Sequence, residues 1–154
     1  MDDSDAELFA AHADELTRFA TGLVGPADAE DVVTGAFLRC WTSSRWPSVE
    51  NRRAYLYRAV LNEARSLHRG RRRRVARERS VAPREALPEA ATPHDLDGAL
   101  DVLSLRQRSV IVLTYWGDLD PASIATLLNI SDGSVRQHLA RGRARLREVL
   151  DDDR

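Results

Sequence analysis

Residues 120–147 read DPASIATLLNISDGSVRQHLARGRARLR, and this stretch decides the fold. Its apolar side chains recur at three- and four-residue steps in two short blocks, which is the pattern of two amphipathic helices. The residues on the inner faces of these helices are Ile124, Ala125, Leu128, Val135 and Leu139. A short helix, a tight turn and a second helix packed by a few apolar residues predict a helix-turn-helix.

The turn between the two helices has the residues that such a turn needs. Asn129 tolerates the left-handed conformation, and Ser131 or Asp132 is the candidate N-cap of the second helix. The alternative is a plain helical hairpin with a solvated arginine face. The small Ala125, the turn, the cap and the arginine cluster together favour the helix-turn-helix.

The outer face of the second helix predicts what it contacts. Early residues of a recognition helix reach base edges in the major groove, where arginine pairs with guanine and glutamine with adenine. Arg136 and Gln137 hold such positions. Arg143, Arg145 and Arg147 extend the basic surface toward phosphates.

The rest of the chain also has helical periodicity, without the alternation of a strand. We expect one helix around Leu8 to Leu23, a second from the Gly25-Pro26 break to about Trp41, and a third from about Asn51 into the arginines at 69–74. Residues 46–48 are predicted to be a loop. The fold class is therefore all-α.

Residues 75–94 differ from their surroundings. They contain three prolines (Pro83, Pro88 and Pro93) and few large apolar side chains, so they cannot build a core and predict a flexible linker. We therefore expect two small helical domains, residues 1–74 and 95–154, joined by this linker.

Charge is balanced overall but unevenly distributed. The formal net charge is -1, yet residues 1–31 hold nine acidic residues and one arginine, while residues 32–94 hold fourteen arginines and five acidic residues. Residues 132–149 are a second basic segment, with five arginines and two acidic residues. Two separate basic segments predict two separate contacts with a polyanion, and solvated helix faces are the alternative.

Other functional classes lack their characteristic residues. No apolar run approaches the roughly 18–20 residues that cross a bilayer, and the acidic N-terminus is unlike a secretory signal, so we expect a cytoplasmic protein without membrane insertion. Cys40 is the only cysteine, and the four histidines are scattered. No phosphate-binding loop or nucleophile motif occurs. We expect no enzyme, no catalytic residues, no cofactor and no metal.

Three ordered motifs resemble a known family. Residues 105–116, LRQRSVIVLTYW, together with the helix-turn-helix resemble region 4 of the extracytoplasmic-function sigma factors. Upstream, AEDVV at 29–33 and AFLRCW at 36–41 resemble their region 2.2, and AYLYRAVLNEARSLHR at 54–69 resembles regions 2.3 and 2.4. The resemblance spans nearly the whole chain in the family's order, and it is strongest to the actinobacterial type.

The resemblance implies an RNA polymerase sigma factor that directs promoter recognition and transcription initiation. Its partners would be promoter DNA, the β′ clamp helices and β flap of bacterial core RNA polymerase, and, as a further candidate, an anti-sigma factor. The residues matching the core-polymerase-binding motif are Asp28, Glu30, Asp31, Phe37, Leu38 and Trp41. Phe37 and Trp41 also fit a plain helix core, and that alternative stays open.

The same resemblance assigns DNA contacts to both halves. Region 2 would melt and hold the -10 element through Tyr55, Arg58, Asn62, Arg65, Arg69, Arg71 and Arg72. Region 4 would bind the -35 duplex through Ser134, Arg136, Gln137, Ala140, Arg141, Arg143 and Arg145.

Departures from the family pattern bear on affinity more than on fold. Thr34 and Gly35 stand where the family usually has Gln and Glu, so the acidic contact with core polymerase should be weaker. A glycine inside a helix also costs about 1 kcal/mol relative to alanine. Two competing hypotheses remain: an ordinary helix-turn-helix regulator, and a sigma-like adaptor that binds polymerase without melting DNA.

Overall fold

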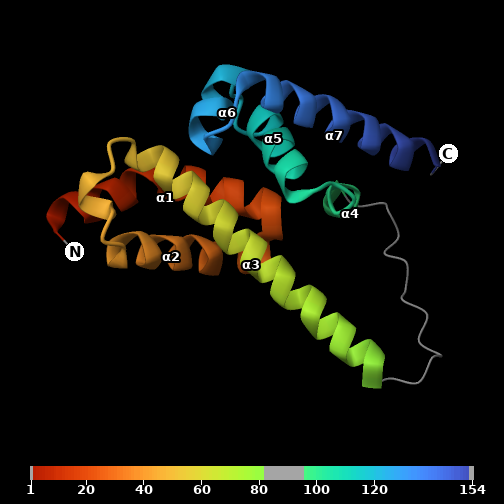
Figure 1. Cartoon of the computed structure of the whole chain (residues 1–154), viewed down its shortest axis with the longest axis horizontal. Helices are drawn as coiled ribbons and strands as arrows, with labels where there is room; N and C mark the ends of the chain where they lie inside the picture. Colours follow the sequence, from red (N-terminus) through yellow and green to blue (C-terminus); the bar gives the residue numbers. More distant parts are fainter. Residues whose placement is uncertain (1, 82–95, 153–154) are drawn as a thin grey trace.

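The first half of the chain is a bundle of three α-helices. The computed structural model describes residues 2–81 and 96–152 (Figure 1). Helix α1 (Asp3–Val24) and helix α2 (Pro26–Thr42) meet at Gly25, and the 3-10 helix η1 (Trp46–Ser48) leads into the long helix α3 (Arg52–Val81). The residues at 46–48 thus form a 3-10 turn where the sequence predicts a loop.

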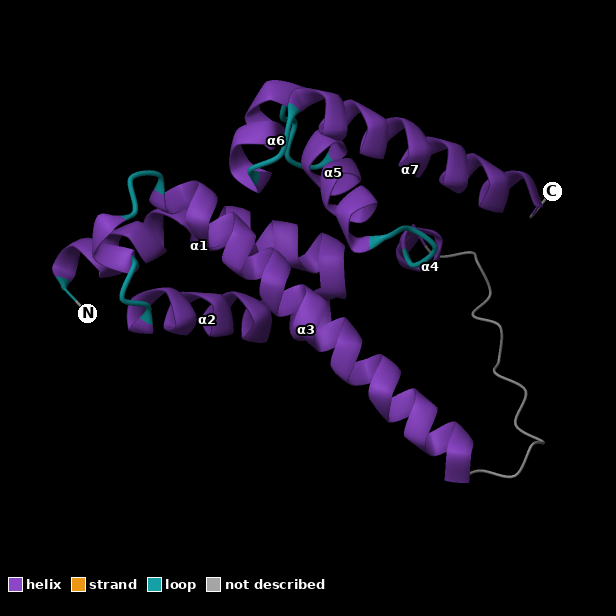
Figure 2. Cartoon of the chain, viewed as in Figure 1, coloured by secondary structure: helices purple, strands orange, loops and turns teal. Residues whose placement is uncertain are grey.

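The second half has four helices. They are α4 (Leu96–Leu100), α5 (Leu105–Tyr115), α6 (Pro121–Leu128) and α7 (Asp132–Asp152). Within the described ranges there is no strand, as the colouring of Figure 2 shows, so the all-α prediction is confirmed.

The predicted linker differs from the structure at its start. Helix α3 continues to Val81 and projects away from the rest of the molecule (Figure 1), so residues 75–81 are helical rather than part of a linker. Their side chains from 75 to 80 are exposed. The remaining residues of the predicted linker, 82–94, lie outside the described residues.

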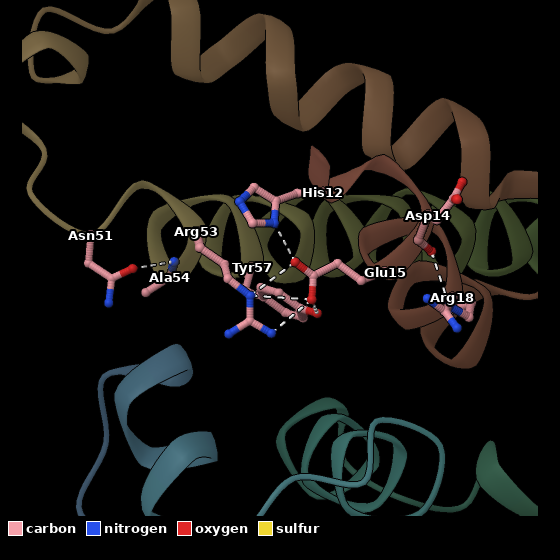
Figure 3. A network of polar contacts seen from close by, with 8 residues as sticks. All are labelled: His12, Asp14, Glu15, Arg18, Asn51, Arg53, Ala54 and Tyr57. Carbon is pink, nitrogen blue, oxygen red and sulfur yellow. Dashed lines mark hydrogen bonds and ion pairs between the residues drawn. The ribbon is translucent and has the colours of Figure 1, made fainter. Parts of the chain in front are cut away.

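A buried carboxylate joins α1 to α3. Figure 3 shows Glu15 surrounded by His12, Arg53 and Tyr57. Arg53 donates from Nε and Nη2 to the two carboxylate oxygens at 3.0 and 2.8 Å, and the Tyr57 hydroxyl donates at 2.9 Å. Burial alone would raise the pKa of Glu15, but the hydrogen bonds from Arg53, Tyr57 and His12 outweigh it and lower the pKa to about 2.

The two halves pack against each other. Helix α5 lies on α1 and α6 lies on α3, and one continuous apolar core runs from Leu16 and Phe19 in the first half to Val112 and Ile124 in the second. The two groups of helices predicted as separate domains are therefore in direct apolar contact in this structure.

The contact between α1 and α5 is unusually close at Gly22. A Cβ atom built on Gly22 would lie 2.6 Å from Cγ1 of Val112, so only glycine allows this approach. The Gly22 carbonyl has no partner within its own helix, because residue 26 is Pro26, which has no N–H. Arg108 of α5 supplies the missing donor, with its Nε 2.6 Å from the Gly22 oxygen.

We predict opposite effects for two glycine-to-alanine substitutions. Gly22→Ala should lower the free energy of unfolding, because the overpacking cost of about 1–3 kcal/mol exceeds the helix-propensity gain of about 1 kcal/mol. The matched control is Gly70→Ala, because no atom lies within 4 Å of a Cβ at Gly70; it should stabilise the protein. Urea unfolding measures both, and equal effects would contradict the close approach.

We also predict that Glu15 makes the protein acid-sensitive. Its folded pKa, about 2, lies below the ordinary value of 4.5, so its stabilisation is present above pH 4.5 and is lost as the pH falls toward 2. Glu15→Gln should lower stability at pH 7 and flatten its decline between pH 4.5 and 2. The exposed Glu7 on the same helix provides the control, Glu7→Gln, which should leave the pH profile unchanged.

Candidate nucleic-acid interface

The helix-turn-helix predicted from residues 120–147 is formed by α6 and α7. Asn129 adopts the left-handed conformation at φ 54° and ψ 49°, and it turns the chain between the two helices. The Ser131 Oγ accepts a hydrogen bond from the Ser134 N–H at 3.0 Å, which identifies Ser131 as the N-cap. Both expectations for the turn are confirmed.

One stripe of α7 holds the helix against α5 and α6. Val135 and Gly142 are buried, and Leu139 and Leu146 are half-buried at helical spacing. A Cβ at Gly142 would lie 3.1 Å from Cγ1 of Ile111, so this glycine lets α7 lie close to α5. The recognition helix is therefore fixed from one side, and its opposite side is left uncovered.

The uncovered side carries most of the residues predicted to contact the -35 duplex. Five of the predicted residues are exposed with no hydrogen-bond partner or only local ones: Arg136, Gln137, Ala140, Arg141 and Arg145. Ser134 is half-buried beside the cap. Arg143 points toward α5, where its Nε donates to the Tyr115 hydroxyl at 2.6 Å. Tyr115 was missed at the sequence level because it lies 28 positions away.

A cavity between α2 and α3 brings together three residues predicted to contact the -10 element. It has a volume of about 290 Å³ and is lined by Tyr55, Arg58 and Asn62, together with Arg39, Cys40, Ala59 and Glu63. The Arg58 guanidinium lies 5.9 Å from the centre of the Tyr55 ring. Asn62 is exposed, and its Oδ1 accepts a hydrogen bond from Arg65.

Two wall residues of this cavity form an ion pair that the sequence pattern does not indicate. Arg39 of α2 contacts Glu63 of α3. Cys40 closes the cavity floor, and burial raises the pKa of its thiol to about 11, so the thiol stays protonated. Only the packing of α2 on α3 reveals these contributions.

The remaining predicted -10 residues follow the cavity along α3. Arg69 and Arg72 are exposed, and Arg65 is half-buried. Arg71 forms an ion pair with Asp28 of α2. The predicted basic track is thus continuous along one helix, but one of its arginines is paired with a residue that we predicted to contact polymerase.

Helix α2 divides the residues predicted to bind core polymerase into two groups. Glu30, Asp31 and Leu38 are exposed, with 54% of Leu38 accessible. Phe37 is buried, and its ring packs edge-on against Phe9 at a centroid distance of 4.2 Å. Phe37 therefore belongs to the core, which corrects its assignment to the contact surface. Trp41 is half-buried beside it.

Other kinds of site have no counterpart in the described part of the chain. Within residues 2–81 and 96–152, no group of three metal-ligating side chains lies together. No helix in these ranges is long and apolar enough to span a membrane.

Sequence comparison matches both halves to one family. Residues 8–74 match Sigma-70 region 2, and residues 94–146 match Sigma-70 region 4. The chain is 37% identical to the RNA polymerase sigma-E factor of Streptomyces coelicolor, covering 94% of this chain and 84% of that one. It is 33% identical to the ECF RNA polymerase sigma factor SigL of Mycobacterium tuberculosis, covering 86% and 80%. The chain belongs to the extracytoplasmic-function sigma factors.

Solved structures of related sigma factors have the same fold. The sigma factor RpoE of Bartonella quintana, solved in complex with the anti-sigma factor NepR, superposes with a TM-score of 0.68 at 27% identity and covers 97% of this chain and 98% of that one. CnrH, solved with the cytosolic domain of CnrY, superposes with a TM-score of 0.65 at 27% identity, covering 97% and 89%. This sigma factor therefore shares its helical architecture with sigma factors that bind anti-sigma partners.

We predict that two arginines of α7 contribute differently to duplex binding. Arg136→Ala should cost about 1–3 kcal/mol on the preferred -35 duplex and relax the preference at one base pair. Arg145→Ala should weaken binding equally on all duplexes, because a phosphate contact carries no sequence information. Binding to duplexes varied one base pair at a time tests this. Equal losses without a change in base preference would make Arg136 a phosphate contact.

Proposed function

We propose that the two halves of this sigma factor bind the two promoter elements separately. The cavity lined by Tyr55, Arg58 and Asn62 is the observation that carries the proposal, because a plain duplex-binding regulator has no use for a second, concave site on another domain. An initiation factor needs such a site, since a base taken out of the stack must be held.

In this proposal the cavity receives an unstacked base of the -10 element. The Asn62 amide offers both a donor and an acceptor to a base edge. Tyr55 and Arg58 offer flat faces, and stacking of a base on an aromatic ring is worth about 1–3 kcal/mol. The half-buried Tyr55 ring and the exposed Asn62 side chain support this role.

The arginines of α3 hold the backbone of the separated strand. Those free of printed ion pairs and exposed near the cavity are Arg69, Arg72, Arg73 and Arg74. Phosphate contacts of this kind are independent of sequence and weaken as salt rises. They supply affinity for the strand, while the cavity supplies the preference for a base.

The exposed face of α7 binds the -35 element as a duplex. Arg136 and Gln137 lie near the start of the helix, where side chains of a recognition helix reach base edges. Helix α2 binds the clamp helices of core polymerase through Glu30, Asp31 and Leu38, an acidic surface with one apolar side chain. The protein acts by binding and positioning DNA on polymerase, without chemistry of its own.

The first test concerns Asn62. In holoenzyme reconstituted with Streptomyces coelicolor core polymerase, Asn62→Ala should leave core binding and -35 duplex binding unchanged. It should reduce open-complex formation and alter the preferred base at one -10 position. The measurement is the permanganate reactivity of promoter thymines. Wild-type protein that binds core polymerase yet yields no reactive thymines on any bound promoter would favour the adaptor hypothesis.

A second set of variants separates strand affinity from base preference. Replacing Arg72, Arg73 and Arg74 by glutamine should lower open-complex formation without changing base preference. The deficit should shrink at high salt, because the lost phosphate contacts are already screened in the wild type. Arg71 is left in place, since its ion pair with Asp28 would confound the comparison. A deficit that is independent of salt would contradict the phosphate role.

A further inference from the structure

The C-terminal end of α1 is the point at which the second half docks on the first. Pro26 leaves the Gly22 carbonyl without an intrahelical donor, and Arg108 of α5 provides one. Arg108 is buried, and its Nη1 also binds the Asp101 carboxylate at 2.7 Å. The next carbonyl, that of Leu23, is 2.9 Å from Nε2 of His68 on α3. An arginine from the other half thus completes the end of α1.

The apolar part of the dock is close at one place and open at another. Gly22 and Val112 approach as near as glycine allows. Beside them lies a cavity of about 160 Å³ lined by residues of both halves, among them Phe19, Tyr57, Leu113 and Trp116. Trp116 is 55% exposed at this edge. An unfilled joint forgoes part of the packing energy of a permanent domain core.

Like charges at the junction oppose the docking. Arg106 of α5 faces Arg65 of α3, and burial together with this neighbour lowers the pKa of Arg106. On the other side of Arg106 lies His138 of α7, whose pKa is lowered by burial and by the charges of Arg106 and Arg141. Separation of the two halves would relieve the repulsion between Arg65 and Arg106.

The docked arrangement is too short to reach both promoter elements. Elements centred about 25 base pairs apart lie about 85 Å apart along the duplex, at 34–36 Å per turn. Here α6 packs on both α3 and α7, so the axes of α3 and α7 come within about 20 Å of each other at the usual 8–10 Å per helix pair. Adding the full length of α7, about 32 Å at 1.5 Å per residue, still leaves the distance unspanned.

We propose that the packing of α5 on α1 is a latch that holds this sigma factor in a closed resting form, and that the latch must open before both promoter elements are bound. The proposal rests on the two-element function given above. Helix α2 makes no extensive contact with the second half, and its Glu30, Asp31 and Leu38 are exposed in the closed form. Core polymerase therefore binds the closed form first, and opening follows on the enzyme.

A disulfide across the latch tests the proposal on the full-length chain. A Cβ at Gly22 would lie 3.2 Å from Cβ of Val112, close to the 3.5–4.5 Å typical of a disulfide. The double variant Gly22→Cys/Val112→Cys also replaces the valine that a side chain at position 22 would strike. The native Cys40 is 1% exposed and stays out of the reaction. Diamide closes the bridge, and dithiothreitol reopens it in the same sample.

The expected result is a loss confined to promoter engagement. The promoter probe is a duplex selected from a randomised library by wild-type holoenzyme. The oxidised variant should bind core polymerase and an isolated -35 duplex as the reduced variant does. Its open-complex yield, measured by permanganate, should fall at least about tenfold and return on reduction. The single variants Gly22→Cys and Val112→Cys, treated identically, should show no dependence on diamide.

Two results would overturn the proposal. One is an oxidised variant that forms open complexes as well as the reduced one. The other comes from X-ray scattering of the free wild-type chain, which needs no substitution: a radius of gyration larger than that of the docked arrangement would show that the closed form is not the resting state. If wild-type holoenzyme selects no promoter at all, the two-element function itself fails, and that outcome is distinct from both.

Discussion

The carbonyl group of Gly22 is the constraint on which the arrangement of this molecule depends. Pro26 removes the donor that would satisfy it, and a buried carbonyl without a partner costs on the order of 1–3 kcal/mol. Arg108, 86 positions further along the chain, meets that requirement. The absence of a side chain at Gly22 lets α5 come close enough for the bond to form. One glycine and one proline near the end of a helix thus determine where the second half of the protein docks.

The two candidate DNA-binding surfaces are built on different physical principles. The recognition helix α7 is held by a narrow apolar stripe and leaves its outer face free, so its specificity resides in exposed polar side chains. The site on α3 is concave and shared with α2, and its walls include the ion pair between Arg39 and Glu63. An exposed helix suits the edges of paired bases, whereas a concave site suits a base that has left the stack.

Local periodicity was sufficient to predict a large part of both sites. Tyr55, Arg58 and Asn62 are spaced by three and four residues, so a helix places them on one face regardless of what packs behind it. The turn at Asn129 and the cap at Ser131 follow from short-range chemistry in the same way. Phe37 was misassigned because an aromatic residue at helical spacing has the same pattern whether it faces a core or a partner. Only its contact with Phe9 decides between the two.

The sequence by itself determined the all-α class, most helix boundaries, the helix-turn-helix and the family, because each follows from contacts within a few residues of the chain or from motifs in a fixed order. The tertiary structure decided what those contacts cannot encode: the continuation of α3 to Val81, the pairing of Arg71 with Asp28 and of Arg143 with Tyr115, and the docking of α5 on α1. These features join residues that are distant in sequence. Their existence depends on how close two helices can approach, which is fixed by the volume of a few side chains and by which buried polar groups still need a partner.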